Sequence, residues 1–150
     1  MLIGVNNESL LDTSAIYIPD PAVAAHRVCY MGYFSRANCP PGCSSLIAEV
    51  TAPPGHELLG VSDSGLTEML VRQLHGAGII NPAEVVATDV TTCPFGYVVY
   101  DRDYQRNVTA VREYFAGQGI ELLGRFGRFE YINMDEVVRR AIELADRLGG

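Results

Sequence analysis

The sequence predicts an α+β fold built on a mostly antiparallel sheet. Short β-rich runs separated by proline and glycine turns fill the first half of the chain, as in strands joined by hairpins. From Ser62 onward, apolar residues recur every three to four positions, which is typical of amphipathic helices. Because strands cluster early and helices late, a doubly wound parallel sheet is disfavoured. We expect two to three helices packed on the sheet, the last of them at the C-terminal end.

Turn signals bound each predicted strand. Asn6 to Thr13 is polar and turn-like, Pro19-Asp20-Pro21 closes the second strand, and Pro53-Pro54-Gly55 closes the fourth. Proline cannot donate to a strand ladder, so it favours a strand end at these points. The predicted strands span residues 1–5, 15–18, 26–33, 45–51 and 85–90, and two further short extended segments span 97–100 and 120–123.

Three amphipathic helices are predicted from apolar stripes. The first begins at Ser62 or Ser64, ends at Gly76 or Gly78, and carries Leu66, Met69, Leu70 and Leu74 on its stripe. The second spans residues 103–116, with Val108, Val111, Tyr114 and Phe115 facing inward. The third spans residues 134–148 and buries Val137, Val138, Ala141, Leu144 and Leu148.

Length and composition indicate one globular domain over residues 1–150. The chain is 48% hydrophobic and 19% charged, and its net charge is −7. An acidic chain of this kind is a poor match to a nucleic-acid phosphate backbone, so we expect no nucleic-acid partner. It contains neither a signal peptide nor an apolar run long enough to span a membrane, and we expect a cytoplasmic location.

The four cysteines do not predict a metal site. Cys39 and Cys43 are the only close pair, and no further ligands with recognisable spacing lie near them. A structural zinc site needs two more ligands. We therefore expect two reduced thiols in a surface turn and no bound metal.

Common catalytic motifs are missing from the sequence. The dinucleotide-binding pattern of three glycines between a strand and a helix is absent, because Gly76-Ala77-Gly78 and Gly117-Gln118-Gly119 both follow helices. The three histidines lie far apart along the chain and form no recognisable catalytic set. The chain alone therefore holds no complete catalytic constellation.

One segment near the C-terminus has the form of a ligand site. A short extended segment leads into Gly124-Arg125, where a glycine lets a ligand approach the backbone. Downstream, Asn133 is a candidate helix cap, with Glu136 placed to reach back to its amide. The free N–H groups of such a helix start favour an anionic ligand atom. Pattern alone leaves open an anion site, a flavin site or a plain strand-loop-helix.

The same segment carries a family resemblance. Residues 124–135 resemble the C-terminal flavin motif of UDP-galactopyranose mutases and related amine-oxidase-like FAD proteins. Three earlier segments are similar to the same family in the same order: residues 15–20, residues 33–49 and residues 97–104. The matching positions in the second of these are Ser35, Asn38, Pro41, Ser44, Ser45, Leu46 and Glu49. The position after Tyr97 departs from the family, since it is Val98 where proline is common.

This resemblance implies a set of residue roles. Gly124 and Arg125 would contact FAD, with the arginine near the flavin or the pyrophosphate. Asn133, Met134 and Asp135 would open the last helix beside the flavin pyrimidine edge, where a positive helix end favours the anionic reduced flavin. Tyr97 and Tyr100 would form part of the wall facing a nucleotide-sugar substrate. In the mutase, the reduced flavin attacks the sugar anomeric carbon as UDP-galactopyranose becomes UDP-galactofuranose, a step in cell-surface polysaccharide synthesis.

Three functional alternatives follow. The first is a C-terminal fragment of a mutase-like flavoprotein that lacks the dinucleotide-binding half and is inactive alone. The second is a fragment of an FAD-dependent amine or porphyrinogen oxidoreductase. The third is a free-standing binding or interaction module. A missing half should leave an apolar face uncovered, so a homo-oligomer formed through that face is also expected.

Overall fold

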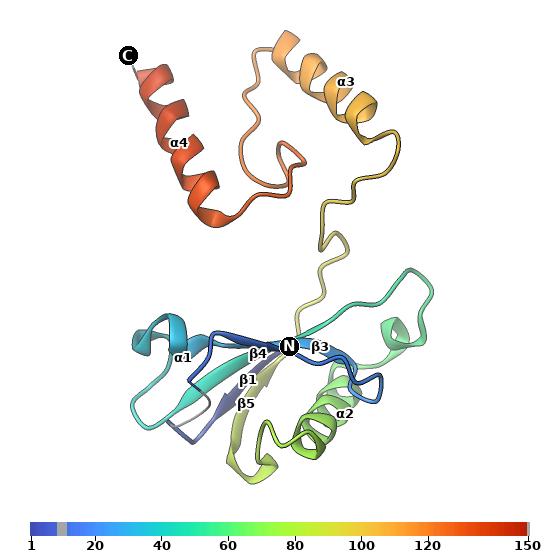
Figure 1. The fold of residues 1–150 in the computed structure, drawn as a ribbon, viewed down its shortest axis with the longest axis vertical. Helices are drawn as coiled ribbons and strands as arrows, with labels where there is room; N and C mark the ends of the chain where they lie inside the picture. The colour runs from blue at the N-terminus through green and yellow to red at the C-terminus, as the bar shows by residue number, and fades with distance from the viewer. Residues whose placement is uncertain (9–11, 150) are drawn as a thin grey trace. The chain divides into compact units, whose positions relative to one another are not determined.

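The chain divides into two compact units in this computed structural model, which describes residues 1–8 and 12–149. Internal contacts group Met1–Thr92 in one unit and Cys93–Gly150 in the other (Figure 1). Residues 9–11, part of the predicted turn at 6–13, lie outside the described residues. No change in composition marks the division at residue 92, and the predicted single domain stays a prediction.

The first unit is built on a five-stranded sheet with the strand order β2-β3-β4-β1-β5. Every pairing in it is antiparallel, and the last helix of the chain is C-terminal, so the predicted α+β class is confirmed. The strands are β1 (Leu2–Val5), β2 (Ala15–Tyr17), β3 (Ala25–Tyr30), β4 (Ser44–Val50) and β5 (Val85–Asp89).

Short helical segments fill several connections of the first unit. They are α1 (Met31–Phe34), η1 (Arg36–Asn38), η2 (Glu57–Gly60) and η3 (Pro82–Glu84). The prediction of one strand over residues 26–33 was therefore wrong at its end. The Ser35 amide donates to the Met31 carbonyl, closing a helical turn there.

The two short extended segments predicted in the second unit are not strands. Residues 97–100 and 120–123 carry no strand assignment. The backbone N–H and C=O groups of a strand need hydrogen-bond partners on a neighbouring strand. These two segments make other contacts instead. The Ile120 amide donates to the Phe115 carbonyl at 3.0 Å, which ties it to the preceding helix end. In the segment 97–100, the side-chain hydroxyl of Tyr100 accepts a hydrogen bond from the Tyr131 amide at 2.7 Å.

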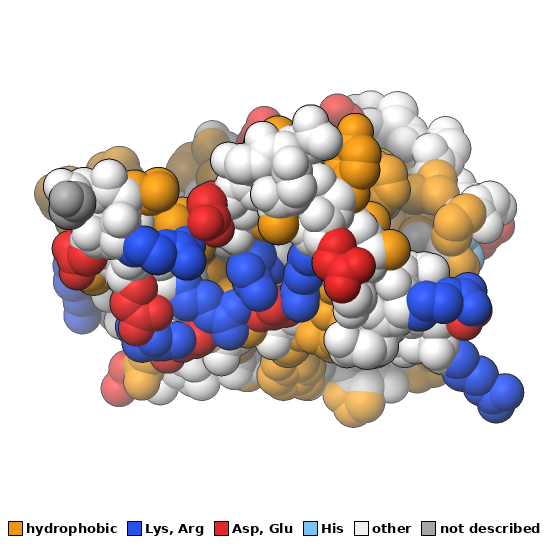
Figure 2. Space-filling view, turned by 90° about the horizontal axis from the view of Figure 1, so that it is seen from above, with side chains coloured by type: hydrophobic (Ala, Val, Ile, Leu, Met, Phe, Trp, Pro, Cys, Tyr) orange, Lys and Arg blue, Asp and Glu red, His pale blue; other side chains and the backbone are white. Residues whose placement is uncertain are grey.

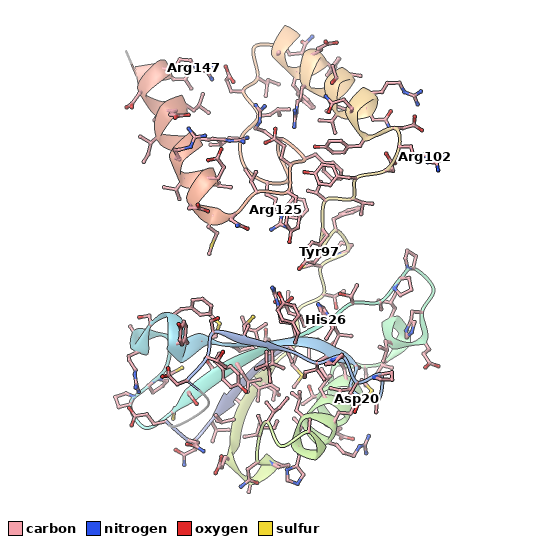
Figure 3. All side chains as sticks on the ribbon, viewed as in Figure 1. Asp20, His26, Tyr97, Arg102, Arg125 and Arg147 are labelled. Carbon is pink, nitrogen blue, oxygen red and sulfur yellow. The ribbon has the colours of Figure 1, made fainter. Side chains whose placement is uncertain are left out.

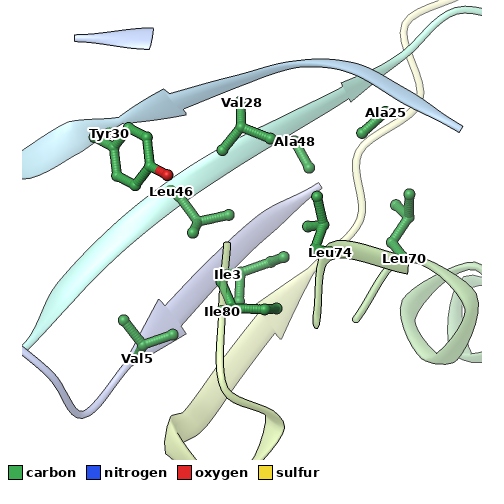
Figure 4. Packing of buried hydrophobic residues seen from close by; sticks show 10 residues of the cluster. All are labelled: Ile3, Val5, Ala25, Val28, Tyr30, Leu46, Ala48, Leu70, Leu74 and Ile80. Carbon is green, nitrogen blue, oxygen red and sulfur yellow. The ribbon is translucent and has the colours of Figure 1, made fainter. Parts of the chain in front are cut away.

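One face of the sheet packs on helix α2 (Asp63–Gly76) (Figure 4). Alternate residues of the central strands point into this core, because side chains along a strand alternate between its two faces. Leu70 and Leu74 of α2 are fully buried against them. The core residues are Ile3, Val5, Ala25, Val28, Tyr30, Leu46, Ala48, Leu70, Leu74 and Ile80.

Helix α2 begins and ends as its sequence predicts. Ser62 caps it, accepting a hydrogen bond from the Gly65 amide at 3.2 Å. Gly78 terminates it with a φ of 71°, and the Ile79 amide donates to the Leu74 carbonyl. A left-handed residue at this position lets the last helical carbonyls find partners, and glycine adopts it without steric cost.

The second unit contains α3 (Tyr104–Gly117) and α4 (Met134–Gly149). Their predicted apolar stripes are only partly covered. In α3, Val108 is buried, whereas Val111 and Tyr114 are exposed. In α4, Val137, Ala141 and Leu144 are half-buried, but Val138 and Leu148 are more than half exposed. The prediction that all these residues are buried was therefore wrong for four of them.

Within residues 1–8 and 12–149, the structure contains no helix with the length and apolarity needed to cross a bilayer.

The contribution of the α2 stripe is measurable. Leu74→Ala removes a fully buried side chain from the core, and the resulting cavity should lower the free energy of unfolding by about 2–5 kcal/mol. Urea unfolding followed by far-UV circular dichroism measures this change. Arg72→Ala, on the exposed side of the same helix, should stay within about 0.5 kcal/mol of wild type. Equal effects for the two variants would contradict the assignment of this face to the core.

Candidate functional site

A tight turn carries the predicted Gly124-Arg125 pair. Gly124 has a φ of 86° and Phe129 has a φ of 50°, so the backbone is left-handed at both ends of the turn. The Arg128 amide donates to the Gly124 carbonyl at 3.0 Å, and the Glu130 amide donates to the Arg125 carbonyl at 2.9 Å. Only glycine fits at Gly127, where an added Cβ would lie 2.2 Å from the Leu123 carbonyl oxygen.

Arg125 lies against two tyrosine rings of the second unit. Its guanidinium carbon is 4.1 Å from the ring centre of Tyr131 and 5.4 Å from that of Tyr97. Figure 3 labels Arg125 and Tyr97. The two rings are stacked, with centres 6.1 Å apart and planes at 16°. Both distances are within the range of cation–π attraction. Tyr97 and Arg125, for which the family resemblance implies contacts with substrate and cofactor, therefore belong to one cluster.

The Arg125 guanidinium is not fully satisfied by protein groups. Its Nε and Nη2 atoms are buried and have no hydrogen-bond partner. Buried donors are nearly always paired in proteins, and an arginine fork is suited to carboxylate or phosphate oxygens. The cluster therefore holds a cation with two buried donors that no protein group in the described chain satisfies.

Tyr100 and Tyr104 support the turn from the segment before α3. The Tyr131 amide donates to the Tyr100 hydroxyl at 2.7 Å, and the Tyr104 hydroxyl donates to the Phe129 carbonyl at 2.5 Å. Their rings meet edge to face with centres 4.3 Å apart. Tyr100, predicted to face substrate, thus also holds Tyr131 in place through its hydroxyl.

Glu130 joins the turn to both helices of the second unit. Its carboxylate accepts from Arg112 of α3 at 2.7 Å, from Arg128 of the turn at 3.2 Å, and from Arg140 of α4. Burial raises the pKa of Glu130, but the hydrogen bonds from Arg140 and Arg128 and the nearby positive charges outweigh it and hold this pKa below its ordinary value. Figure 2 shows arginine and acidic side chains side by side in one band.

The start of α4 differs in detail from its prediction. The Asn133 carbonyl accepts the first helical hydrogen bond, from the Val137 amide at 3.1 Å. Glu136 does not act as the predicted capping partner of the Asn133 amide. Its carboxylate pairs instead with Arg139 and Arg140, both at 2.6 Å, and hydrogen bonds from these arginines lower its pKa to about 2. Met134 and Asp135, the other predicted residues here, are exposed.

Sequence patterns missed Tyr131 as a site residue. It lies inside the segment that resembles the flavin motif, but neither spacing nor residue type distinguishes it from Phe126 or Phe129. Its stacking on Arg125 becomes visible only after the turn is folded. Five residues lie between it and Arg125 along the chain, and one of them, Phe129, has a left-handed backbone.

The first unit has a second polar cluster that the sequence did not predict, on strands β2, β3 and β4. Tyr17 lies opposite Arg27, and Arg27 lies opposite Glu49. Arg27 Nη2 is 2.5 Å from Glu49 Oε1, and Arg27 Nη1 donates to the Tyr17 hydroxyl at 3.4 Å. Only the strand register brings these three residues into one row. Across the described part of the chain, no group of three or more His, Cys, Asp or Glu residues could hold a metal ion.

Comparison with known proteins identifies the class of fold to which this chain is similar. No protein-family model matches the chain, and no curated protein matches it. Among solved structures, the fold is similar to that of a protein described as reduced UDP-galactopyranose mutase, with a TM-score of 0.70 and 22% identity. The match covers 87% of this chain and 28% of that chain. This chain therefore shares a mutase-like fold and spans less than a third of the length of the protein it matches.

The contact at Gly127 can be tested by adding one methyl group. Gly127→Ala would place its Cβ 2.2 Å from a backbone oxygen, so the turn must shift, at a cost of about 1–3 kcal/mol in unfolding free energy. Urea unfolding and the NMR shifts of Arg125 and Tyr131 report the change. Gly117→Ala is the matched control, because no atom lies within 4 Å of its added Cβ. Unchanged stability and shifts in Gly127→Ala would contradict this turn geometry.

Glu130→Gln tests the ion-pair centre. Losing the charge should lower unfolding free energy at pH 7 by about 1–3 kcal/mol. Because the folded pKa is depressed below 4.5, the wild-type contribution is complete above pH 4.5 and is lost as pH falls through the folded value. The two stability curves should therefore converge in acid. Glu143→Gln, which removes an exposed carboxylate paired with Arg139, should leave the pH profile nearly unchanged, and parallel curves for Glu130→Gln would refute the assignment.

Proposed function

We propose that this chain is the C-terminal, flavin-contacting part of a UDP-galactopyranose mutase-like flavoprotein. In this proposal residues 1–92 supply the substrate-side sheet and residues 93–150 supply the flavin-side loop and helix of one domain. The mutase-like fold supports it. The observation that carries it is the Arg125 guanidinium, which stacks on Tyr131 and Tyr97 and keeps two buried donors unpaired.

The residues present fit an anionic dinucleotide such as FAD. Gly124 leaves open space where a side chain would stand, so a planar ring can approach its backbone. Arg125 offers the two unpaired donors to pyrophosphate or flavin oxygens. Asn133, Met134 and Asp135 open α4, whose first amides and positive dipole end suit a negatively charged ring edge.

FAD would supply the redox-active ring of the mutase reaction, and this chain's residues would bind and orient. Arg125 neutralises negative charge, and Gly124 sets the approach of the ring. Tyr97 and Tyr100 would form the wall facing the nucleotide sugar. Tyr131 joins them in the proposal because its ring stacks with that of Tyr97. The Tyr97 hydroxyl has no hydrogen-bond partner within the described chain, so it is available to a sugar or phosphate oxygen.

The chain alone is proposed to be inactive. FAD-binding folds hold the pyrophosphate mainly on a glycine-rich dinucleotide motif, and that motif is absent from this sequence. The oxidoreductase alternative shares the cofactor half of the proposal and differs in the substrate. The mutase-like neighbour favours a nucleotide sugar.

Self-association is proposed for the exposed apolar surface of α4. Val138, Ile142 and Leu148 are each more than half exposed, and such residues favour burial against another chain. Light scattering over a range of concentrations would detect the resulting mass increase, and a monomer at every concentration would refute it.

A ligand titration tests the proposed function. With the ¹⁵N-labelled chain at millimolar ligand, FAD should shift the amides of residues 124–125 and 133–135, and UDP-galactose should shift those of Tyr97, Tyr100 and Tyr131. Arg125→Ala should weaken the FAD response about tenfold or more, since it removes a charge-assisted contact. Arg106→Ala, an exposed arginine of α3, is the matched control.

Two results would contradict the proposal. Shifts confined to residues 1–92, or equal shifts for Arg125→Ala and Arg106→Ala, would remove the flavin site from the second unit. Tight stoichiometric FAD binding together with turnover of UDP-galactopyranose by this chain alone would overturn the fragment assignment.

A further inference from the structure

The loop between η1 and β4 carries two cysteines, one just before a tight turn and one at its last position. Cys39 precedes Pro40-Pro41-Gly42, and Cys43 follows it. The Cys43 amide donates to the Pro40 carbonyl at 3.1 Å, which closes a β-turn. Gly42 holds the turn with a φ of 79°. In a β-turn the first and fourth Cα atoms, here those of Pro40 and Cys43, lie within about 7 Å of each other, so Cys43 lies close to the residue that follows Cys39.

Both cysteines border the same space. The Cys39 Sγ atom lies 3.2 Å from the Ser45 hydroxyl. Cys43 stands two residues before Ser45, and side chains two apart along an extended chain share a face. Cys39 and Cys43 accordingly line one cavity of about 1110 Å³, and both are half-buried. A small reagent therefore has room to approach both residues.

The surroundings of the two sulfurs differ. The Ser45 hydroxyl is placed to donate to Cys39 and stabilise negative charge on that sulfur. The Cys43 thiol instead donates to Asn6 Oδ1 across 4.0 Å. Cys39 is therefore suited to attack first and Cys43 to resolve the product.

The other two cysteines provide comparisons within the same chain. Cys29 lies in β3, where burial raises the pKa of its thiol, so it should react slowly. Cys93 is exposed. The nearest cysteine along the chain is Cys43, 50 positions before it. Cys93 should accept a reagent without an intramolecular partner.

We propose that Cys39 and Cys43 form a dithiol modification site, which low-molecular-weight disulfides of the glutathione class oxidise reversibly to an intramolecular disulfide. The Cys39 thiolate attacks one sulfur of the reagent and releases one thiol, leaving a mixed disulfide. The Cys43 thiolate then attacks the Cys39 sulfur and displaces the second thiol. The protein loses two electrons and two protons, and the reagent gains them as two thiols.

Digestion with trypsin allows Cys29, the Cys39–Cys43 pair and Cys93 to be analysed separately. Because the chain has no lysine, cleavage at Arg27, Arg36, Arg72 and Arg102 places Cys29, the Cys39–Cys43 pair and Cys93 on three different peptides. The folded chain is equilibrated with reduced and oxidised glutathione, acid-quenched, alkylated and analysed by mass spectrometry. The peptide 37–72 should lose two hydrogens and carry no glutathione, whereas Cys93 should carry a glutathione adduct and Cys29 should be alkylated.

Variants and an unfolded control make the result decisive. Cys43→Ser should trap glutathione on Cys39, because the resolving thiol is gone. Oxidation of the pair should be favoured about tenfold or more in the folded chain over the urea-unfolded chain, since the fold raises the effective concentration of one thiol near the other. Gly42→Ala, checked for folding by circular dichroism, should reduce that advantage because it strains the turn.

Three outcomes would overturn the proposal. One is alkylation of both Cys39 and Cys43 under conditions in which Cys93 is glutathionylated. Another is glutathione on each member of the pair without an intramolecular link. The third is equal oxidation of the folded and unfolded chains, which would assign the link to sequence spacing alone and not to the folded site.

Discussion

The Glu130 carboxylate is the constraint on which the second unit depends. Val98 and Val108 are the buried hydrophobic residues of this unit in the described chain, so apolar packing alone offers little to hold its segments together. One carboxylate instead gathers arginines from α3, the turn and α4. Because Glu130 stands directly before Tyr131 and closes the turn that carries Arg125, fixing it also fixes the aromatic cluster. Breaking such a network leaves several charges uncompensated.

The first unit was largely predictable because its signals are local. Strand-ending prolines, the Ser62 cap and the 3.6-residue stripe of Leu70 and Leu74 each act within a few residues. Predictions that depend on distant partners were less successful. Residues 97–100 have the composition of a strand, but among the residues that the structure describes no strand pairs with them. The apolar stripe of α4 indicates a buried helix, yet its burial depends on surfaces that its own sequence does not specify.

In the candidate site, too, local patterns were predictable and contacts between distant residues were not. Gly124 and Arg125 were predicted because a glycine and an arginine after an expected extended segment form a local pattern, and their role as ligand contacts stays a prediction. Tyr131 and the Arg27–Glu49 pair were missed, since a left-handed turn and a strand register bring them into place. The prediction that Glu136 caps the helix was wrong because Arg139 and Arg140 bind the same carboxylate. Hydrogen bonds from charged donors are stronger than one from a neutral amide.

The position of β1 has a consequence for how the first unit assembles. This strand lies between β4 and β5, and Leu2 pairs with Ile47 on one side and with Asp89 on the other. The sheet centre thus consists of contacts between residues remote in sequence, which raises the contact order and slows folding. Until the segment from Val85 to Asp89 has left the ribosome, one edge of β1 is an open template for pairing. Translation speed and chaperone capture during that interval would then influence the yield of folded protein.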